Sequence, residues 1–157
     1  MEWSDVIADP CLQDLPYKIE LNEYGAIVMT PASNRHGQQQ IEIGHLLKLQ
    51  GPDGRTLVEC SIDTKSGVKV ADVAWLSASF VELHAEATPY EQAPEVCIEI
   101  LSPSNSRDEM DEKMQLYFEQ GAKEVWLCSE AGKLDFYLPE GQADTSTLFP
   151  GFPQSIA

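Results

Sequence analysis

Three residues stand out because their charged groups interrupt or flank apolar patterns. Asp72 lies in the apolar run over residues 68–75, Glu99 is the one acid in VCIEIL at residues 96–101, and Lys113 follows in a segment with helical spacing. Two carboxylates on adjacent strands can hold Mg²⁺ through oxygen ligands. A nearby ammonium group can then orient an attacking water or stabilise developing negative charge. The order of these residues therefore suggests a metal-assisted site.

Each residue also has an interpretation without chemistry. Asp72 could be a strand-edge carboxylate that accepts backbone hydrogen bonds, and Lys113 could extend its ammonium to solvent from the rim of a buried helix face. Glu99 is harder to explain in this way, because an unpaired carboxylate between Ile98 and Ile100 loses its hydration without compensation. We expect burial and the like charge of Asp72 to raise the pKa of Glu99, unless Lys113 offsets both.

The elements that position these residues follow from apolar spacing and turn residues. We expect strands and helices in this order: a β-hairpin over residues 17–30 that reverses at 22–25, a helix over 35–50, strands over 56–62 and 68–75 joined at 65–67, a short helix over 77–84, a strand over 96–101, a helix from 106 to 121, and a second hairpin over 124–129 and 134–138. Strands mixed with a few helices predict an α/β (α+β) fold, in which helices pack on a mixed sheet.

Two of the expected helices have recognisable faces. The first is predicted from Ile41, His45, Leu46 and Leu49, which recur at helical spacing up to Gly51. The second begins with a capping box, in which Ser106 caps the helix and Glu109 lies three residues later. Its stripe runs through residues 110, 114, 117 and 118, and Lys113 lies at the edge of that stripe. Lys113 is therefore expected beside the sheet.

Length and charge limit the function classes. The 157 residues suit a single domain over residues 1–157. With 26 acids and 10 lysines and arginines, the net charge is −16 and no basic stripe is visible, which argues against tight binding of duplex nucleic acid. The sequence shows neither a leader nor an apolar run long enough for a membrane span, so we expect a soluble, cytoplasmic protein.

Four cysteines are widely separated along the chain, and none forms a C-x-x-C pair. Cys60, Cys97 and Cys128 lie in apolar runs and are expected to be small buried hydrophobic residues. Nothing in this pattern implies a zinc site or an oxidising compartment.

The residues around the three charged groups resemble a known family. LPYKIELNEYG, MTPASNRHG, VKVADVAW and PEVCIEILSPSNSRDEMDEKMQLYFEQGAKEVWLC are similar to the Uma-two family, within the PD-(D/E)XK nuclease superfamily, and the likeness covers about residues 15–138. The resemblance implies a restriction-endonuclease-like fold and Mg²⁺- or Mn²⁺-dependent hydrolysis of DNA. It implies Asp72, Glu99 and Lys113 as catalytic residues, and Asp72, Glu99 and the Ile100 carbonyl as metal ligands.

This chain departs from the family pattern at three positions. Ala71 replaces the usual proline before the aspartate, and Leu101 occupies the ordinary lysine position of the superfamily, so Lys113 must reach the site from the helix. Glu109 replaces an aspartate one turn before Lys113 and could pair with that lysine.

Two further residues match positions that the family tends to keep. Glu20 could add a third carboxylate to the metal site, or could be a solvent-facing strand residue. His36 could be a ligand, or a surface histidine near a helix N-terminus.

Two hypotheses follow. The first is a metal-dependent DNA endonuclease, with DNA binding weakened by the acidic charge. The second is a non-catalytic, homodimeric interaction module that keeps the nuclease fold. Exposed strand edges favour self-association, so a homodimer is expected in either case.

Overall fold

A six-stranded mixed sheet forms the centre of the protein in the computed structural model, which describes residues 1–156. Its strands lie in chain order: β3 (Arg55–Thr64), β4 (Gly67–Leu76), β5 (Val96–Ile100), β6 (Glu124–Cys128), β7 (Leu134–Leu138) and β8 (Gly141–Ala143). Only β5 and β6 run parallel, and every other neighbouring pair is antiparallel. The predicted mixed sheet is therefore confirmed.

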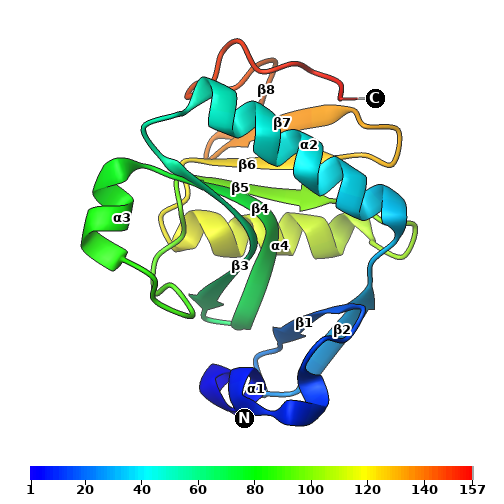
Figure 1. Ribbon diagram of the computed structural model, residues 1–157. Helices are drawn as coiled ribbons and strands as arrows, with labels where there is room; N and C mark the ends of the chain where they lie inside the picture. The colour runs from blue at the N-terminus through cyan, green and yellow to red at the C-terminus, as the bar shows by residue number, and fades with distance from the viewer. Residues whose placement is uncertain (157) are drawn as a thin grey trace.

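Two helices cover the opposite faces of this sheet (Figure 1). Helix α2 (Asn34–Gln50) packs with alternate residues of the central strands, among them Ile98 and Trp126. Helix α4 (Arg107–Glu119) packs on the other face with Cys97 and Val125. Since the central strands are covered on both sides, β5 and β6 are buried at every position.

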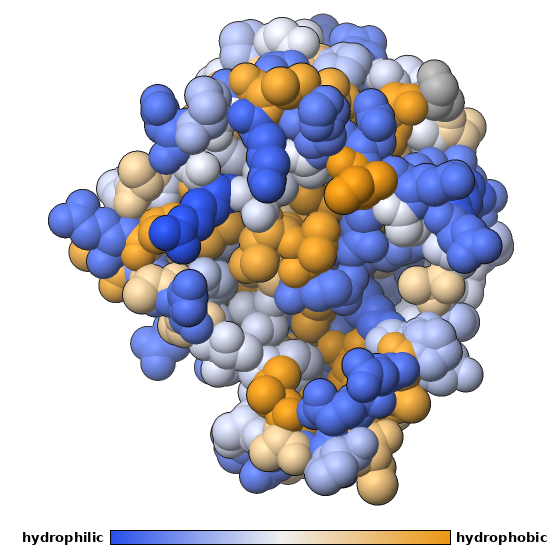
Figure 2. Space-filling model, in the orientation of Figure 1, coloured by the Kyte–Doolittle hydropathy of each residue, from blue (hydrophilic) through white to orange (hydrophobic). Residues whose placement is uncertain are grey.

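The buried face of α2 includes only part of the apolar stripe, with Leu46 packed against the core. Ile41 and Leu49 are exposed, whereas Ile43, Leu47 and the polar Gln39 face the core. Gln39 tolerates this position because its side-chain amide donates to two backbone carbonyls near the β6–β7 turn. On the face shown in Figure 2, apolar side chains form small groups among hydrophilic ones. The helix predicted over residues 35–50 is thus present.

The N-terminal elements form a smaller layer beside the first residues of β4. Strands β1 (Tyr17–Leu21) and β2 (Ile27–Pro31) form a separate antiparallel hairpin, preceded by α1 (Trp3–Ala8) and a 3₁₀ turn, η1 (Pro10–Leu12). Apolar side chains of α1 and β1 pack with Val68 and Val70 of β4. At the β3–β4 turn, a Cβ atom on Gly67 would collide with the carbonyls of Leu21 and Asn22, so the turn and the hairpin fit closely.

The remaining elements complete the connections. Helix α3 (Ala78–His84) lies between β4 and β5, as predicted from residues 77–84. Cys60, Cys97 and Cys128 are buried and unpaired, which confirms their predicted role as core residues, whereas Cys11 is exposed. Among residues 1–156, no helix has the length and apolar character needed to cross a membrane.

Candidate active site

The two strand acids face each other where β4 and β5 separate. The antiparallel register pairs Val73 with Ile98, and one further step along both strands places Asp72 opposite Glu99. Both side chains are almost completely buried, with exposed fractions of 1% and 4%. The Ile100 amide donates to Asp72 Oδ2 at 2.7 Å, which fixes the aspartate to the neighbouring strand. The predicted convergence of the two acids is therefore present in the structure.

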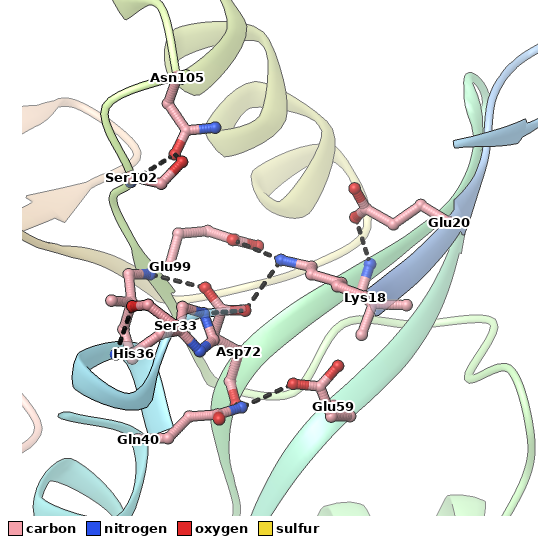
Figure 3. Close-up of polar contacts among 12 residues, drawn as sticks. Lys18, Glu20, Ser33, His36, Gln40, Glu59, Asp72, Glu99, Ser102 and Asn105 are labelled. Atoms are coloured by element: carbon pink, nitrogen blue, oxygen red, sulfur yellow. Dashed lines mark hydrogen bonds and ion pairs between the residues drawn. The ribbon is translucent and has the colours of Figure 1, made fainter. Parts of the chain in front are cut away.

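A lysine that the sequence did not single out lies between these acids. Lys18 of β1 places its Nζ 3.0 Å from Asp72 Oδ1 and 3.0 Å from Glu99 Oε2 (Figure 3). Its side chain is only 10% exposed. Glu20 lies two residues later in the same strand, so the side chains of Lys18 and Glu20 point to the same side. Because Glu20 was already a candidate acid, this spacing was a signal in the sequence that could have identified Lys18.

Lys113 reaches the site from α4, as expected. Its Nζ lies 2.8 Å from Glu20 Oε2 and 3.1 Å from Glu99 Oε1. The phenol of Tyr117, one turn later on the same helix face, donates to Glu99 Oε1 at 2.7 Å. Lys113 and Tyr117 of α4 thus contact one carboxylate oxygen of Glu99, and Lys18 contacts the other.

Asp72 is contacted from the opposite side, by α2. His36 Nε2 lies 3.2 Å from Asp72 Oδ1, and Gln40 Nε2 donates to the Asp72 carbonyl at 2.9 Å. The same amide contacts Glu59 Oε1 on β3. Glu59 has a φ of 53° and lies outside the β3–β4 pairing, which is interrupted at Asp72. The ladder is therefore distorted at the candidate site, where Gln40 binds the Asp72 carbonyl.

These contacts decide between the alternatives left open for three residues, Glu20, His36 and Glu109. Glu20 is half-buried rather than solvent-facing, because it pairs with Lys113 and accepts a hydrogen bond from the Val70 amide at 2.7 Å. His36 is not a surface histidine, since its side chain is 13% exposed and contacts Asp72. Glu109 does not pair with Lys113 and instead completes the capping box of α4 with Ser106.

The cluster shifts the pKa values of its members in opposite directions. Burial raises the pKa of Glu99 above its usual value, in the direction expected from the sequence, despite the opposing charges of Lys113 and Lys18. Burial would also raise the pKa of Asp72, but the hydrogen bond from His36 and the charge of Lys18 outweigh it and hold that pKa well below the usual range. Asp72 is therefore the more strongly ionised of the two acids.

The basic groups respond to the same acids. The hydrogen bond to Asp72 raises the pKa of His36 above 6.5. Burial alone would lower the pKa of Lys18, but three neighbouring carboxylates outweigh burial and raise this pKa well above 10.5. Burial likewise opposes ionisation of Glu20, yet Lys113 and Lys18 lower its pKa. The charged forms of Lys18, Glu20 and His36 are thus stabilised by their neighbours, whereas that of Glu99 is not.

The site opens into a cavity of about 390 Å³. Its lining brings together Lys18, Glu20, His36, Asp72, Glu99 and Lys113, along with Ile100. Figure 3 shows the side chains converging from β1, β4, β5 and α2. All six site residues predicted from the sequence, Ile100 included, therefore border one cavity, and Lys18 is an additional charged residue there.

The donor set is consistent with a hard divalent cation. Asp72 Oδ1 and Glu99 Oε2 converge on a single cation position, because both contact the same ammonium nitrogen. Within residues 1–156, no group of three or more histidine, cysteine or acidic side chains is arranged as a complete metal cage. Mg²⁺ commonly binds through only one or two carboxylates and retains several waters, so two acids suffice for it in chemical terms.

The chain matches the family model for Uma2, described as "Putative restriction endonuclease", over residues 10–155. The chain belongs to the Uma2 family. The resemblance noted for residues 15–138 is therefore confirmed and extends over nearly the whole chain.

A solved structure agrees with this assignment at the level of the fold. It is a nuclease-like protein from Anabaena variabilis, described as "a putative nuclease belonging to DUF820". The two structures superpose with a TM-score of 0.77 and 17% identity, covering 99% of this chain and 94% of the other. None of the curated proteins matches the chain in sequence. This Uma2 chain thus has the restriction-endonuclease-like fold expected of its family.

Proposed function

We propose that this Uma2 protein is a metal-dependent endonuclease that hydrolyses DNA phosphodiester bonds in the 390 Å³ cavity. The observation that carries the proposal is the convergence of Asp72 and Glu99 on one cation position, with Lys113 on the second oxygen of Glu99. A structural ion pair requires only two partners. This cluster instead brings titratable groups from five elements, β1, α2, β4, β5 and α4, to one cavity, which is typical of a functional site.

The proposed ligands are the carboxylates of Asp72 and Glu99 and the carbonyl of Ile100. A Mg²⁺ or Mn²⁺ ion bound there would supply an activated water and neutralise charge on the scissile phosphate. Lys113 keeps Glu99 oriented and offers a donor to the attacking water or to a phosphate oxygen. Water oxygen forms the new bond to phosphorus, the bond to the leaving oxygen breaks, and a proton from water ends on that oxygen.

Supporting residues keep the reacting groups in place. Tyr117 is completely buried and holds Glu99 through its phenol, while the Ile100 amide holds Asp72. His36 offers a second donor to Asp72 from α2. These contacts reduce the freedom of both acids, which is the contribution a rigid scaffold makes to catalysis.

A second function is favoured by charge. With a net charge of −16, the counterion-release contribution to duplex binding is small. The pair of acids is also already neutralised by Lys18. A homodimeric interaction module that keeps the fold without catalysis would have both properties.

Cleavage assays distinguish the two functions. Single-stranded DNA, duplex DNA and RNA would be incubated with the protein in Mg²⁺, Mn²⁺ or EDTA over a series of salt concentrations. The endonuclease proposal predicts cleavage that requires the metal, is strongest at low salt and is weak on duplex DNA at physiological salt. Cleavage that persists in EDTA would contradict the metal-dependent mechanism. No cleavage of any substrate would favour the interaction module.

A further inference from the structure

Lys18 occupies the position that the proposed metal would need. Its Nζ is 3.0 Å from one oxygen of each acid, Asp72 Oδ1 and Glu99 Oε2. Each acid uses its second oxygen elsewhere, since Asp72 Oδ2 accepts from the Ile100 amide and Glu99 Oε1 contacts Lys113 and Tyr117. The two oxygens that face each other are therefore both engaged by a single ammonium group.

An ammonium and a divalent ion cannot share this position. Mg²⁺ requires carboxylate oxygens at about 2.0–2.1 Å in near-octahedral geometry. An ammonium that stays in hydrogen-bonding contact with the same two oxygens would lie against the metal, and two cations in a poorly hydrated site repel each other strongly. Binding of the metal therefore requires the Lys18 side chain to move away.

The fold both places Lys18 in the site and leaves room for its departure. Its backbone belongs to β1, which is anchored by the apolar cluster around Val68 and by the close fit at Gly67. The side chain borders the open cavity, whose lining also includes the acid Glu23. A lysine has enough freedom in its four-carbon chain to exchange one acidic neighbour for another without movement of the strand.

We propose that Lys18 is an internal cation that competes with the divalent metal for Asp72 and Glu99, so that the site is latent until metal displaces it. The proposal rests on the function proposed above, because it assumes that these two acids are the metal ligands. In the absence of metal, Lys18 bridges the two buried carboxylates and offsets part of their negative charge. When metal is abundant, the released ammonium adds positive charge to the cavity, where a substrate phosphate would bind.

Metal affinity tests the competition directly. Isothermal titration calorimetry with Mn²⁺ would compare the wild type with Lys18→Met, Lys18→Arg and Lys69→Met. Lys69 borders the same cavity, but in the part of the chain that the structure describes it forms no ion pair with Asp72 or Glu99. Its replacement therefore removes the same charge and leaves Lys18 in place. We expect Lys18→Met to bind Mn²⁺ at least about tenfold more tightly than the wild type, and the other two variants to stay within about threefold.

The wild type provides a second test that does not depend on the stability of a variant. Crystals soaked in Mn²⁺ are expected to show anomalous density between Asp72 and Glu99, with Lys18 Nζ no longer within hydrogen-bonding distance of both. Manganese bound there with Lys18 still in contact with both acids would overturn the inference.

The outcomes separate this inference from the proposed function. Equal or weaker Mn²⁺ binding by Lys18→Met, with a wild-type site that is lost in Asp72→Ala, would refute the competition and leave the metal site standing. No Mn²⁺ binding by the wild type or by Lys18→Met would remove the metal site and the competition together.

Discussion

Replacement of Lys18 by methionine should strongly destabilise the metal-free protein. Methionine keeps most of the length and apolar contact of the side chain but leaves Asp72 and Glu99 facing each other without their shared cation. Both acids are almost completely buried, and removal of one partner from a buried ion pair typically costs about 3–5 kcal/mol. For a chain of this size, such a loss corresponds to a fall in Tm of roughly 10 °C.

A second lysine pair serves as the matched control. Lys65 Nζ also lies 3.0 Å from a carboxylate oxygen, on Glu119, but the lysine side chain is 68% exposed. Because solvent screens this pair, Lys65→Met should lower the unfolding free energy far less than Lys18→Met. The two variants share the substitution and the ion-pair distance, but Lys18 is buried and contacts two acids whereas Lys65 is exposed and contacts one.

Urea denaturation in EDTA would measure both variants, and Glu99→Gln would complete a double-mutant cycle. In the Lys18→Met background, Glu99→Gln should cost less than in the wild type, because Glu99 has already lost its contact with Lys18 and the substitution removes its repulsion with Asp72. Lowering the pH should also reduce the Lys18→Met penalty, since the raised pKa of Glu99 allows it to take up a proton. Equal losses for Lys18→Met and Lys65→Met, or an additive cycle, would refute the view that Lys18 neutralises both acids.

Three further outcomes are expected. Tyr117→Phe removes the donor to Glu99 and should lower the unfolding free energy in urea by about 1.5–3 kcal/mol, as for hydrogen bonds to charged groups; an unchanged value would mean that this bond is not stabilising. In the metal-free protein, His36 binds more protons in the folded state than in the unfolded state at pH values between 6.5 and its raised pKa. The unfolding free energy in urea should therefore fall as pH rises through that window, and His36→Gln should reduce this dependence on pH. Burial raises the pKa of Cys60 to about 12 and that of Cys128 to about 11, so a thiol reagent should label only Cys11 in the native protein, and labelling of a second thiol would contradict the buried positions.

Most of the site could be predicted from the sequence because its charged residues interrupt or flank apolar strand and helix patterns. Glu99 could be identified from its apolar strand alone. The capping box at Ser106 showed where α4 begins, which placed Lys113 one turn before Tyr117 on the side of the helix that faces the sheet. Asp72, Glu20 and His36 depended more on the family resemblance, since an acid in a strand or a histidine near a helix end has an ordinary explanation.

The remaining features depend on tertiary contacts that local patterns do not encode. Lys18 resembles any lysine in a partly exposed hairpin until the hairpin is docked beside β4. Apolar spacing does not reveal the buried face of α2, because that face includes Gln39 and Gly44 while Ile41 is exposed. Helix α1 and strand β8 are short, and both are stabilised by their neighbours more than by their own sequences. The homodimer stays a prediction, which light scattering coupled to size-exclusion chromatography would test.

Cleavage by paired acid variants tests the central claim most directly. Under the metal and salt conditions that give most cleavage by the wild type, Glu99→Gln would be compared with Glu112→Gln. Glu112 borders the same cavity and is exposed on α4, so this control removes an equal charge without touching the acid pair. The account predicts that Glu99→Gln falls to background while Glu112→Gln keeps activity close to that of the wild type. Undiminished cleavage by folded Glu99→Gln would contradict it.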